Sequence, residues 1–234
     1  MYNYPYCVIF PDVKRCRMTV MFYILKFKPE CHIDGIFYVM DAPMESKQFV
    51  RSKLLVARRA LSEDAWLAMS AAVVSEALKI NEVTRAKCVM AYLSIASSRE
   101  VATDELCRKL HEAGKRITVP AVIADCLVPV DYLPGEPLIA GIFGQPEPVR
   151  RTPVDSAELD AILLPVVGID SSGRRMGYGK GYYDRFLSEL AASGMKPCRI
   201  GLAFSLQFLR YLPADPWDES LDYAVHEGGA VRFN

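Results

Sequence analysis

Short apolar runs alternate with helix-forming segments from residue 45 onward, and this alternation limits the fold more than any other feature of the sequence. The runs cover residues 87–95, 116–122, 127–132, 159–167, 199–204 and 221–225. When strands alternate with helices, the strands pair in parallel and the connecting helices cross over the sheet to cover both faces. The sequence therefore predicts an α/β fold: one domain with a mostly parallel sheet between two helical layers, in a three-layer, Rossmann-like arrangement.

The helices between these runs carry recognisable start and stop signals. Residues 45–60 contain strong helix formers and no Gly or Pro. Ser62 is expected to be the N-cap of a helix that continues to about residue 80. Thr103 is expected to cap a helix that stops at Gly114, and a further helix is expected over residues 182–192. The Pro- and Gly-rich stretch 133–153 is expected to be an ordered surface loop.

Residues 1–43 differ from the rest of the chain, because they are rich in aromatic residues and show no sustained period. Two alternating pieces, 19–27 and 35–40, could form short strands or a hairpin. We expect an N-terminal appendage at 1–43 and the main domain at 44–234. Since a helical pattern begins directly after Met44, a second interpretation is that Met44 is the natural start and that the upstream part is an over-extended reading frame.

Composition excludes several classes of protein. The 28 basic and 28 acidic residues give a net charge of zero, so the chain has no overall field to attract nucleic acid. The apolar stretch 18–25 is far shorter than the roughly 20 residues that a membrane-spanning helix needs. No small-x-small cleavage site follows this stretch before Pro29, which argues against a signal peptide. We expect neither a nucleic-acid nor a membrane partner.

The cysteines indicate a reducing compartment. There are seven, an odd number, and none forms a C-x-x-C pair. A zinc site or a disulfide framework is therefore not indicated. Reduced thiols in a cytoplasmic protein are the simplest interpretation.

The segment 168–184 carries the clearest chemical signal, since it leads from an apolar strand into a helix. Gly177, Gly179 and Gly181 alternate there, and glycine lets backbone N–H groups approach an anion without side-chain interference. The start of the following helix adds unpaired N–H groups and a partial positive charge. The segment therefore predicts a phosphate-binding loop.

Charged residues in the same loop suggest the kind of phosphate. Arg174, Arg175 and Lys180 place cations beside the glycines, which suits a triphosphate better than a single carboxylate. Asp184, in the first turn of the helix, is placed to hold Mg²⁺ against the phosphates. The glycine spacing matches neither the P-loop nor the dinucleotide fingerprint. A glycine-rich turn with a solvated basic rim is the alternative interpretation.

The residues Gly-Arg-Arg-Met-Gly-Tyr-Gly-Lys-Gly-Tyr-Tyr-Asp-Arg-Phe-Leu at 173–187 closely resemble the signature of the 5-formyltetrahydrofolate cyclo-ligase family. Four more motifs resemble the family in the right order. They are Lys47-Gln-Phe-Val-Arg51 with Arg58 and Leu61-Ser62 beyond, Tyr92-Leu-Ser94 with Glu100 and Thr103, Phe143-Gly-Gln-Pro-Glu-Pro148, and Gly201-Leu-Ala-Phe-Ser205 through Asp218 to Leu221-Asp222. The resemblance covers about residues 45 to 227.

The resemblance implies a reaction. Members of this family use ATP and Mg²⁺ to convert 5-formyltetrahydrofolate into 5,10-methenyltetrahydrofolate, with release of ADP and phosphate. The γ-phosphoryl group passes to the formyl oxygen, nitrogen 10 attacks the activated carbon, and phosphate departs. The resemblance thus implies a ligase whose partners are these two small molecules, and we expect a monomer or weak oligomer.

The resemblance also implies roles for individual residues. It assigns ATP binding to Lys47, Arg51, Arg175, Met176, Gly177, Tyr178, Gly179, Lys180, Gly181, Tyr182 and Tyr183, with Arg175 and Lys180 as the catalytic residues. It assigns folate binding to Leu93, Glu100, Phe143 and Tyr183. It assigns Mg²⁺ binding to Asp184 and Asp218.

The sequence departs from the family pattern in two places. The spacing between Ser94 and Glu100 is two residues longer than in the family pattern, and Gln145 stands where an aliphatic residue is usual. Because a phosphate-binding loop does not identify the acceptor, two other functions stay open: a phosphotransferase acting on a different small acid, and a non-catalytic folate or nucleotide binder. The joint presence of Arg175, Lys180 and Asp184 argues against the binder, which does not require all three.

Overall fold

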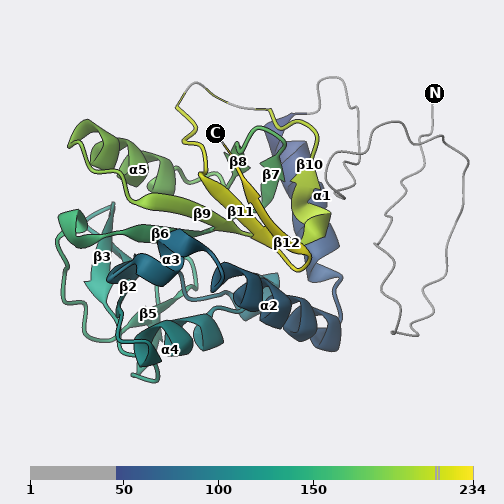
Figure 1. Cartoon of the computed structure of the whole chain (residues 1–234). Coiled ribbons are helices and arrows are strands. Elements are labelled where there is room, and N and C mark those ends of the chain that lie inside the picture. The colour runs from purple at the N-terminus through teal and green to yellow at the C-terminus, as the bar shows by residue number, and fades with distance from the viewer. Residues whose placement is uncertain (1–45, 214, 216, 234) are drawn as a thin grey trace, which may run out of the picture.

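A seven-stranded sheet runs through the middle of the protein in the order β12-β11-β9-β6-β1-β2-β3 (Figure 1). The computed structural model describes residues 46–213, 215 and 217–233. The strands are β1 (Cys88–Met90), β2 (Arg116–Ile123), β3 (Cys126–Asp131), β6 (Ala161–Pro165), β9 (Cys198–Leu202), β11 (Tyr223–His226) and β12 (Gly229–Arg232). The inner strands pair in parallel, and the edge strands β12 and β3 are antiparallel to their neighbours. The predicted mostly parallel sheet is confirmed.

Helices cover both faces of the sheet, as the alternation predicts (Figure 1). They are α1 (Lys47–Arg59), α2 (Glu63–Ala77), α3 (Asn81–Arg85), α4 (Asp104–Glu112) and α5 (Tyr182–Ala192). Strand β6 shows how the core is divided, because its successive side chains point to opposite faces. Leu163 packs with residues of α2 and α4, whereas Ile162 and Leu164 pack with residues of α5.

The helix starts agree with the capping signals in one case and differ in another. The Ala65 N–H donates to the Ser62 side chain at 3.2 Å, so Ser62 caps α2 as predicted. Thr103 occupies the N-cap position of α4, but its side chain does not cap the helix. Its hydroxyl donates instead to the Tyr92 carbonyl at 2.5 Å. The expected capping role of the Thr103 side chain was wrong, because this buried hydroxyl ties the chain after β1 to the start of α4.

Two predicted segments contain structure that the sequence did not indicate. The expected loop 133–153 folds back as an antiparallel hairpin of β4 (Leu138–Ala140) and β5 (Pro146–Pro148). Proline is compatible with a two-stranded edge ribbon, where not every N–H is needed for pairing.

The glycine-rich segment also holds two strands, β7 (Gly168–Asp170) and β8 (Arg175–Met176). With β10 (Phe208–Leu209) they form a small three-stranded sheet. Short 3₁₀ turns lie at Ala96–Ser98, Ser156–Glu158 and Ser205–Gln207. The predicted strand at 87–95 leaves the sheet after Met90 and leads into the first of these turns.

The strands or hairpin expected at 19–27 and 35–40 lie outside the described residues, and so does Met44. Over the part of the chain that is described, no helix combines the length and the apolar character needed to cross a bilayer.

We predict that Leu163→Ala lowers the free energy of unfolding by about 2 to 5 kcal/mol, because the leucine side chain is completely buried and its removal leaves a cavity. Urea denaturation measures the change. Leu67→Ala is the control, since Leu67 lies on α2 with 47% of its surface exposed and should change stability by only about 0.5 kcal/mol. Equal losses in the two variants would contradict the placement of β6 at the centre of the core.

Candidate active site

A cavity of about 660 Å³ opens at the carboxyl ends of β1 and β6. The order in which strands are added to the sheet reverses between these neighbours. After β1 the chain adds β2 on one side, and after β6 it adds β9 on the other side. Ligands of open α/β sheets bind in the crevice that such a reversal creates. The sequence-predicted residues that line the cavity are Lys47, Arg51, Leu93, Glu100, Phe143, Arg175, Gly177, Tyr178, Gly179, Lys180, Gly181, Tyr182, Tyr183, Asp184 and Asp218.

Met176 is the predicted site residue that does not line the cavity. Its side chain is buried, with 1% of the residue exposed. Its carbonyl accepts a hydrogen bond from the Val167 N–H at 2.7 Å. Met176 thus anchors the start of residues 177–181, which are called the glycine loop below.

The glycines of the loop adopt backbone conformations that other residues rarely adopt. Gly179 has φ +86° and Gly181 has φ +70°, both in the left-handed region. A Cβ atom on Gly179 would stand 3.0 Å from Cζ of Arg51, whose Nε donates to the Gly177 carbonyl at 2.8 Å. Gly181 is at the N-cap position of α5 and provides no side-chain cap, which leaves first-turn amides for an anion.

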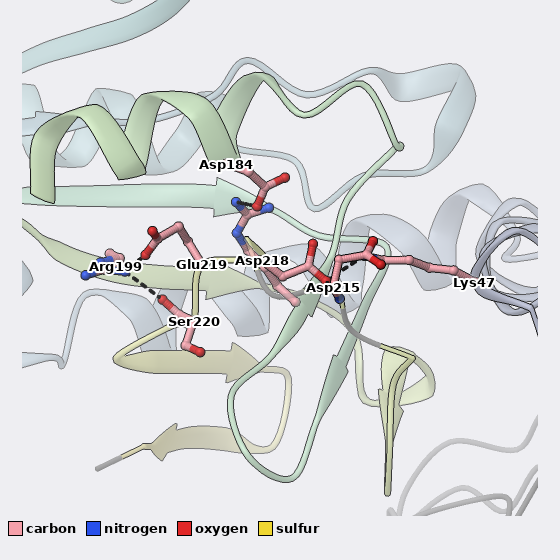
Figure 2. Close-up of polar contacts among 8 residues, drawn as sticks. Lys47, Asp184, Arg199, Asp215, Asp218, Glu219 and Ser220 are labelled. Carbon is pink, nitrogen blue, oxygen red and sulfur yellow. Dashed lines mark hydrogen bonds and ion pairs between the residues drawn. The ribbon is translucent and has the colours of Figure 1, made fainter. Parts of the chain in front are cut away.

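Three ion pairs join two cations and three acids that line the cavity, and all of these residues except Asp215 were assigned to the site from the sequence (Figure 2). The buried Arg175 side chain donates to Asp184 at 2.7 Å. Lys47 reaches from α1 to Asp218 at 2.5 Å and to Asp215 at 2.8 Å. Burial by itself would lower the pKa of Lys47, but the hydrogen bonds and charges of Asp215 and Asp218 raise it above its ordinary value. Lys47 is therefore held in its charged form.

The loop that carries these acids is fixed to the main sheet. Arg199 of β9 donates to Glu219 at 2.7 Å and to the Ser220 carbonyl at 3.3 Å (Figure 2). Asp215 was not predicted from the sequence, because nothing local connects it to Lys47, which lies 168 positions away along the chain. The contact arises only in the fold.

A buried carboxyl group also lines the cavity. Glu100 is 3% exposed, and it accepts hydrogen bonds from the Ile95 N–H at 2.6 Å and from the Tyr178 hydroxyl at 2.5 Å. The indole of Trp66 donates to the Glu100 carbonyl at 2.5 Å. Burial raises the pKa of Glu100, and the two hydrogen bonds and the charge of Arg58 oppose that rise.

Aromatic rings form one wall of the cavity. The rings of Phe143 and Tyr182 are 5.5 Å apart, and Nζ of Lys180 lies 5.7 Å from the Phe143 ring. The Tyr182 hydroxyl donates to Asp125 at 2.7 Å, which fixes the ring. Gln145, the unusual residue of the β4–β5 hairpin, accepts from the Phe143 N–H at 2.9 Å and so shapes the turn that presents Phe143.

Two buried polar atoms of cavity-lining residues have no hydrogen-bond partner among the described residues: Nε of Arg175 and the hydroxyl of Tyr183. A buried polar group left without a partner costs about 1 to 3 kcal/mol, so such atoms mark places where a bound molecule gains a hydrogen bond. Burial raises the pKa of Tyr183, which keeps its hydroxyl protonated and able to donate at neutral pH.

The comparisons with known proteins agree with one another. The family model described as 5-formyltetrahydrofolate cyclo-ligase family matches residues 43–227. A probable 5-formyltetrahydrofolate cyclo-ligase of Caenorhabditis elegans is 29% identical over 207 residues, which cover 84% of this chain and 98% of that protein. The 5-formyltetrahydrofolate cyclo-ligase of Escherichia coli (strain K12) is 30% identical over 72% of this chain and 93% of its own length. The NMR structure of Aquifex aeolicus 5,10-methenyltetrahydrofolate synthetase has a TM-score of 0.70 at 32% identity and covers 80% of this chain and 93% of that one.

We predict that Gly179→Ala destabilises the protein more than Gly194→Ala. Both glycines have positive φ, so alanine costs about 1 kcal/mol at either position. A Cβ on Gly194 meets nothing within 4 Å, whereas on Gly179 it displaces Arg51 and weakens its hydrogen bond to Gly177, for about 1 kcal/mol more. Urea denaturation of both variants measures the difference. Equal stabilities would show that Arg51 moves aside without losing this bond.

Proposed function

Because the chain belongs to the 5-formyltetrahydrofolate cyclo-ligase family, we propose that it is the ligase that converts 5-formyltetrahydrofolate into 5,10-methenyltetrahydrofolate, with ATP hydrolysed to ADP and phosphate. The observation that carries the proposal is that one cavity has two chemically different ends. One group of lining residues has cations and glycine amides, here called the phosphate end, and another has apolar side chains around the buried carboxyl group of Glu100, here called the folate end. This division suits a polyphosphate at the first end and a pterin at the second.

The triphosphate of ATP would lie on the glycine loop. The amides at the start of α5 and the left-handed Gly179 and Gly181 present donors to the phosphates. Lys47 and Arg51 approach from α1, one helical turn apart on the same face. Lys180 extends from the loop with its side chain exposed, so it can follow a charge that moves during the reaction.

Asp184 and Asp218 would hold Mg²⁺. Each carboxylate has one oxygen outside its ion pair, since Arg175 contacts Oδ1 of Asp184 and Lys47 contacts Oδ2 of Asp218. The described residues include no cluster of three or more acids, histidines or cysteines that could hold a metal without other ligands. Mg²⁺ commonly takes one or two protein carboxylates and completes its shell with phosphates and water, so the donor set fits. When bound, the ion would offset negative charge on the phosphates.

The folate would occupy the end at Glu100. A carboxylate accepts hydrogen bonds from the amino group and ring N–H of a pterin. Leu93, Phe143 and Tyr183 supply apolar and aromatic walls for the rings. The same carboxylate disfavours a small acid as the acceptor, because two negative charges would meet in a buried place. This supports the cyclo-ligase over a phosphotransferase that acts on a different acid.

The chemistry needs little covalent participation by the protein. The γ-phosphoryl group passes from ATP to the formyl oxygen, N10 attacks the activated carbon to close the ring and loses its proton, and the oxygen leaves with the phosphate. The protein would hold donor and acceptor in line, and Lys180 and Arg175 would stabilise the charge that develops on the transferred group. Tyr183 and Nε of Arg175 would gain the partners that they lack.

The proposal includes a division of the chain. Residues 44–234 would make up the catalytic domain and residues 1–43 an appendage, which is supported by the family match over 43–227.

The proposal also includes a reducing compartment such as the cytoplasm. It is supported by the described cysteines, which are unpaired: Cys88, Cys107, Cys126 and Cys198.

The proposal is tested with the purified full chain, 5-formyltetrahydrofolate, ATP and Mg²⁺. We expect the absorbance of methenyltetrahydrofolate to rise together with ADP, one for one. A panel of other small acids should give no ADP. No methenyltetrahydrofolate with intact ATP would overturn the proposal, and ADP release with another acid would favour the phosphotransferase.

We predict that Lys180→Ala lowers kcat about 100-fold and changes the Kd for folate by less than about twofold, because the lysine acts on charge that develops during transfer. Single-turnover kinetics and calorimetric folate titration measure the two quantities. Lys196→Ala, at an exposed position outside the cavity, is the control. Equal losses in kcat and in folate affinity would assign Lys180 to ground-state binding.

We predict that Asp184→Asn raises the Mg²⁺ concentration for half-maximal turnover about tenfold, because a neutral carboxamide is a weaker ligand for a hard cation. A metal titration of initial rates measures it. Asp131→Asn is the matched control, since Asp131 forms a surface pair with Arg116 at 3.0 Å, outside the cavity. An unchanged titration would remove Asp184 from the metal site.

A further inference from the structure

Arg58 is a buried cation that joins three segments of the protein. It is 2% exposed, and its guanidinium donates to the Ser98 carbonyl at 2.8 Å, the Val166 carbonyl at 3.1 Å and the Tyr178 hydroxyl at 2.5 Å. A buried charge is tolerated only when it is well hydrogen-bonded. A planar guanidinium can serve three acceptors in different directions, which a lysine ammonium on its flexible stem matches poorly.

The Tyr178 hydroxyl connects this cation to the folate end of the cavity. Arginine can only donate, so the hydroxyl oxygen accepts from Arg58. The single proton of the hydroxyl is then available for Glu100, whose Oε1 lies 2.5 Å away. The Ile95 N–H donates to Oε2 of the same group. Two donors therefore point at Glu100, an arrangement suited to a carboxylate that must accept hydrogen bonds.

We propose that Arg58 and Tyr178 are positioning residues that hold Glu100 as a hydrogen-bond acceptor for the pterin, so that the Tyr178 side chain serves the folate end of the cavity and not the nucleotide end. This rests on the proposed function, which places the pterin at Glu100. The backbone of Tyr178 remains in the glycine loop between Gly177 and Gly179. One residue thus contributes its main chain to the phosphate end and its side chain to the folate end.

The surroundings of Glu100 explain why such support is needed. Burial raises the pKa of Glu100 and so favours the neutral form, which accepts hydrogen bonds less well. The titratable groups that face it are Arg58 from α1, Tyr178 from the glycine loop, Tyr92 from the segment after β1, and Tyr183 from α5. Among these four groups, Arg58 is the cation. The Ile95 N–H, the Tyr178 hydroxyl and the charge of Arg58 all oppose this rise in the pKa of Glu100, so the Arg58–Tyr178 pair is the side-chain part of the stabilisation of the carboxylate.

The main test is Tyr178→Phe, which removes the hydroxyl and keeps the ring. Binding of 5-formyltetrahydrofolate is measured by calorimetry without ATP from about pH 5 to about pH 9, a range that begins near the ordinary pKa of a carboxyl group and extends upward because the pKa of Glu100 is raised. Binding of ATP is measured separately. Losing a hydrogen bond to a charged group should weaken folate binding about tenfold at neutral pH. Because the loss of a donor raises the pKa of Glu100, the acid limb of the binding profile moves to higher pH and the defect shrinks as pH rises. ATP binding should be unchanged.

Tyr223→Phe is the matched control. Its hydroxyl donates to Glu82 at 2.9 Å, so the variant deletes a tyrosine–glutamate hydrogen bond of the same kind outside the cavity. Its folate binding should equal that of the unmodified chain at every pH. A loss in Tyr223→Phe as large as in Tyr178→Phe would overturn the proposal.

Glu100→Gln separates positioning from packing. The carboxamide of the new glutamine cannot ionise in this range. Folate binding in this variant should therefore be weak and should lack the acid limb seen with the unmodified chain. Adding Tyr178→Phe should then cause no further pH-dependent loss. Arg58→Lys, which keeps the charge and loses the planar fork, should shift the pH profile in the same direction as Tyr178→Phe.

The outcomes separate this inference from the proposed function. If the unmodified chain does not bind 5-formyltetrahydrofolate, the proposed function fails and this inference fails with it. If the unmodified chain binds it and Tyr178→Phe leaves affinity and pH profile unchanged, only the role of Arg58 and Tyr178 is overturned. If Tyr178→Phe weakens folate binding equally at every pH, or weakens ATP binding instead, the role of Arg58 and Tyr178 is overturned as well.

Discussion

The reversal of strand order between β1 and β6 is the constraint on which the site depends. The two strands pair in parallel at the centre of the sheet, and the chain leaves them toward opposite edges. Their following loops therefore diverge and open a crevice that buried side chains do not fill. The segment after β1 brings Glu100 to this crevice, and the segment after β6 brings the glycine loop. Sheet topology thus brings together residues 78 positions apart, as the Tyr178–Glu100 hydrogen bond shows.

The phosphate end of the cavity is nearly neutralised by its own side chains. Arg175 pairs with Asp184, and Lys47 pairs with Asp218 and Asp215. A buried Arg175 without Asp184 would be expensive, and the partly exposed Lys47 is stabilised by Asp218 and Asp215, so these pairs keep both signs in one cavity before any ligand arrives. Under the proposed function, phosphates would attract the cations while Mg²⁺ would attract the acids. Each group would exchange one charged partner for another, which limits the desolvation cost of binding.

Much of the fold could be predicted from the sequence because its signals are local. Continuous apolar runs identified β6 and β9, and a serine before acidic residues identified the start of α2. The hairpin β4–β5 was missed, since each of its strands has only three residues and β5 contains two prolines. The side-chain contacts of Thr103, Asp215 and Tyr178 could not be predicted either, because their partners are set by the tertiary fold. The glycine spacing and the family resemblance did identify residues that the structure gathers in one cavity, with the exception of Met176.

Helix α1 relates the two ends of the cavity to each other. Lys47, Arg51 and Arg58 lie on its inner face, at spacings of four and seven residues that repeat with the helical turn. Lys47 contacts Asp218, and Arg51 contacts the glycine loop at Gly177. Arg58 supports Glu100 through the Tyr178 hydroxyl. With a rise of 1.5 Å per residue, the helix separates its first and last contacts by roughly 16 Å along its axis. Because a helix deforms less than a loop, α1 would fix the distance between the phosphoryl donor and its acceptor, and in-line transfer depends on that distance.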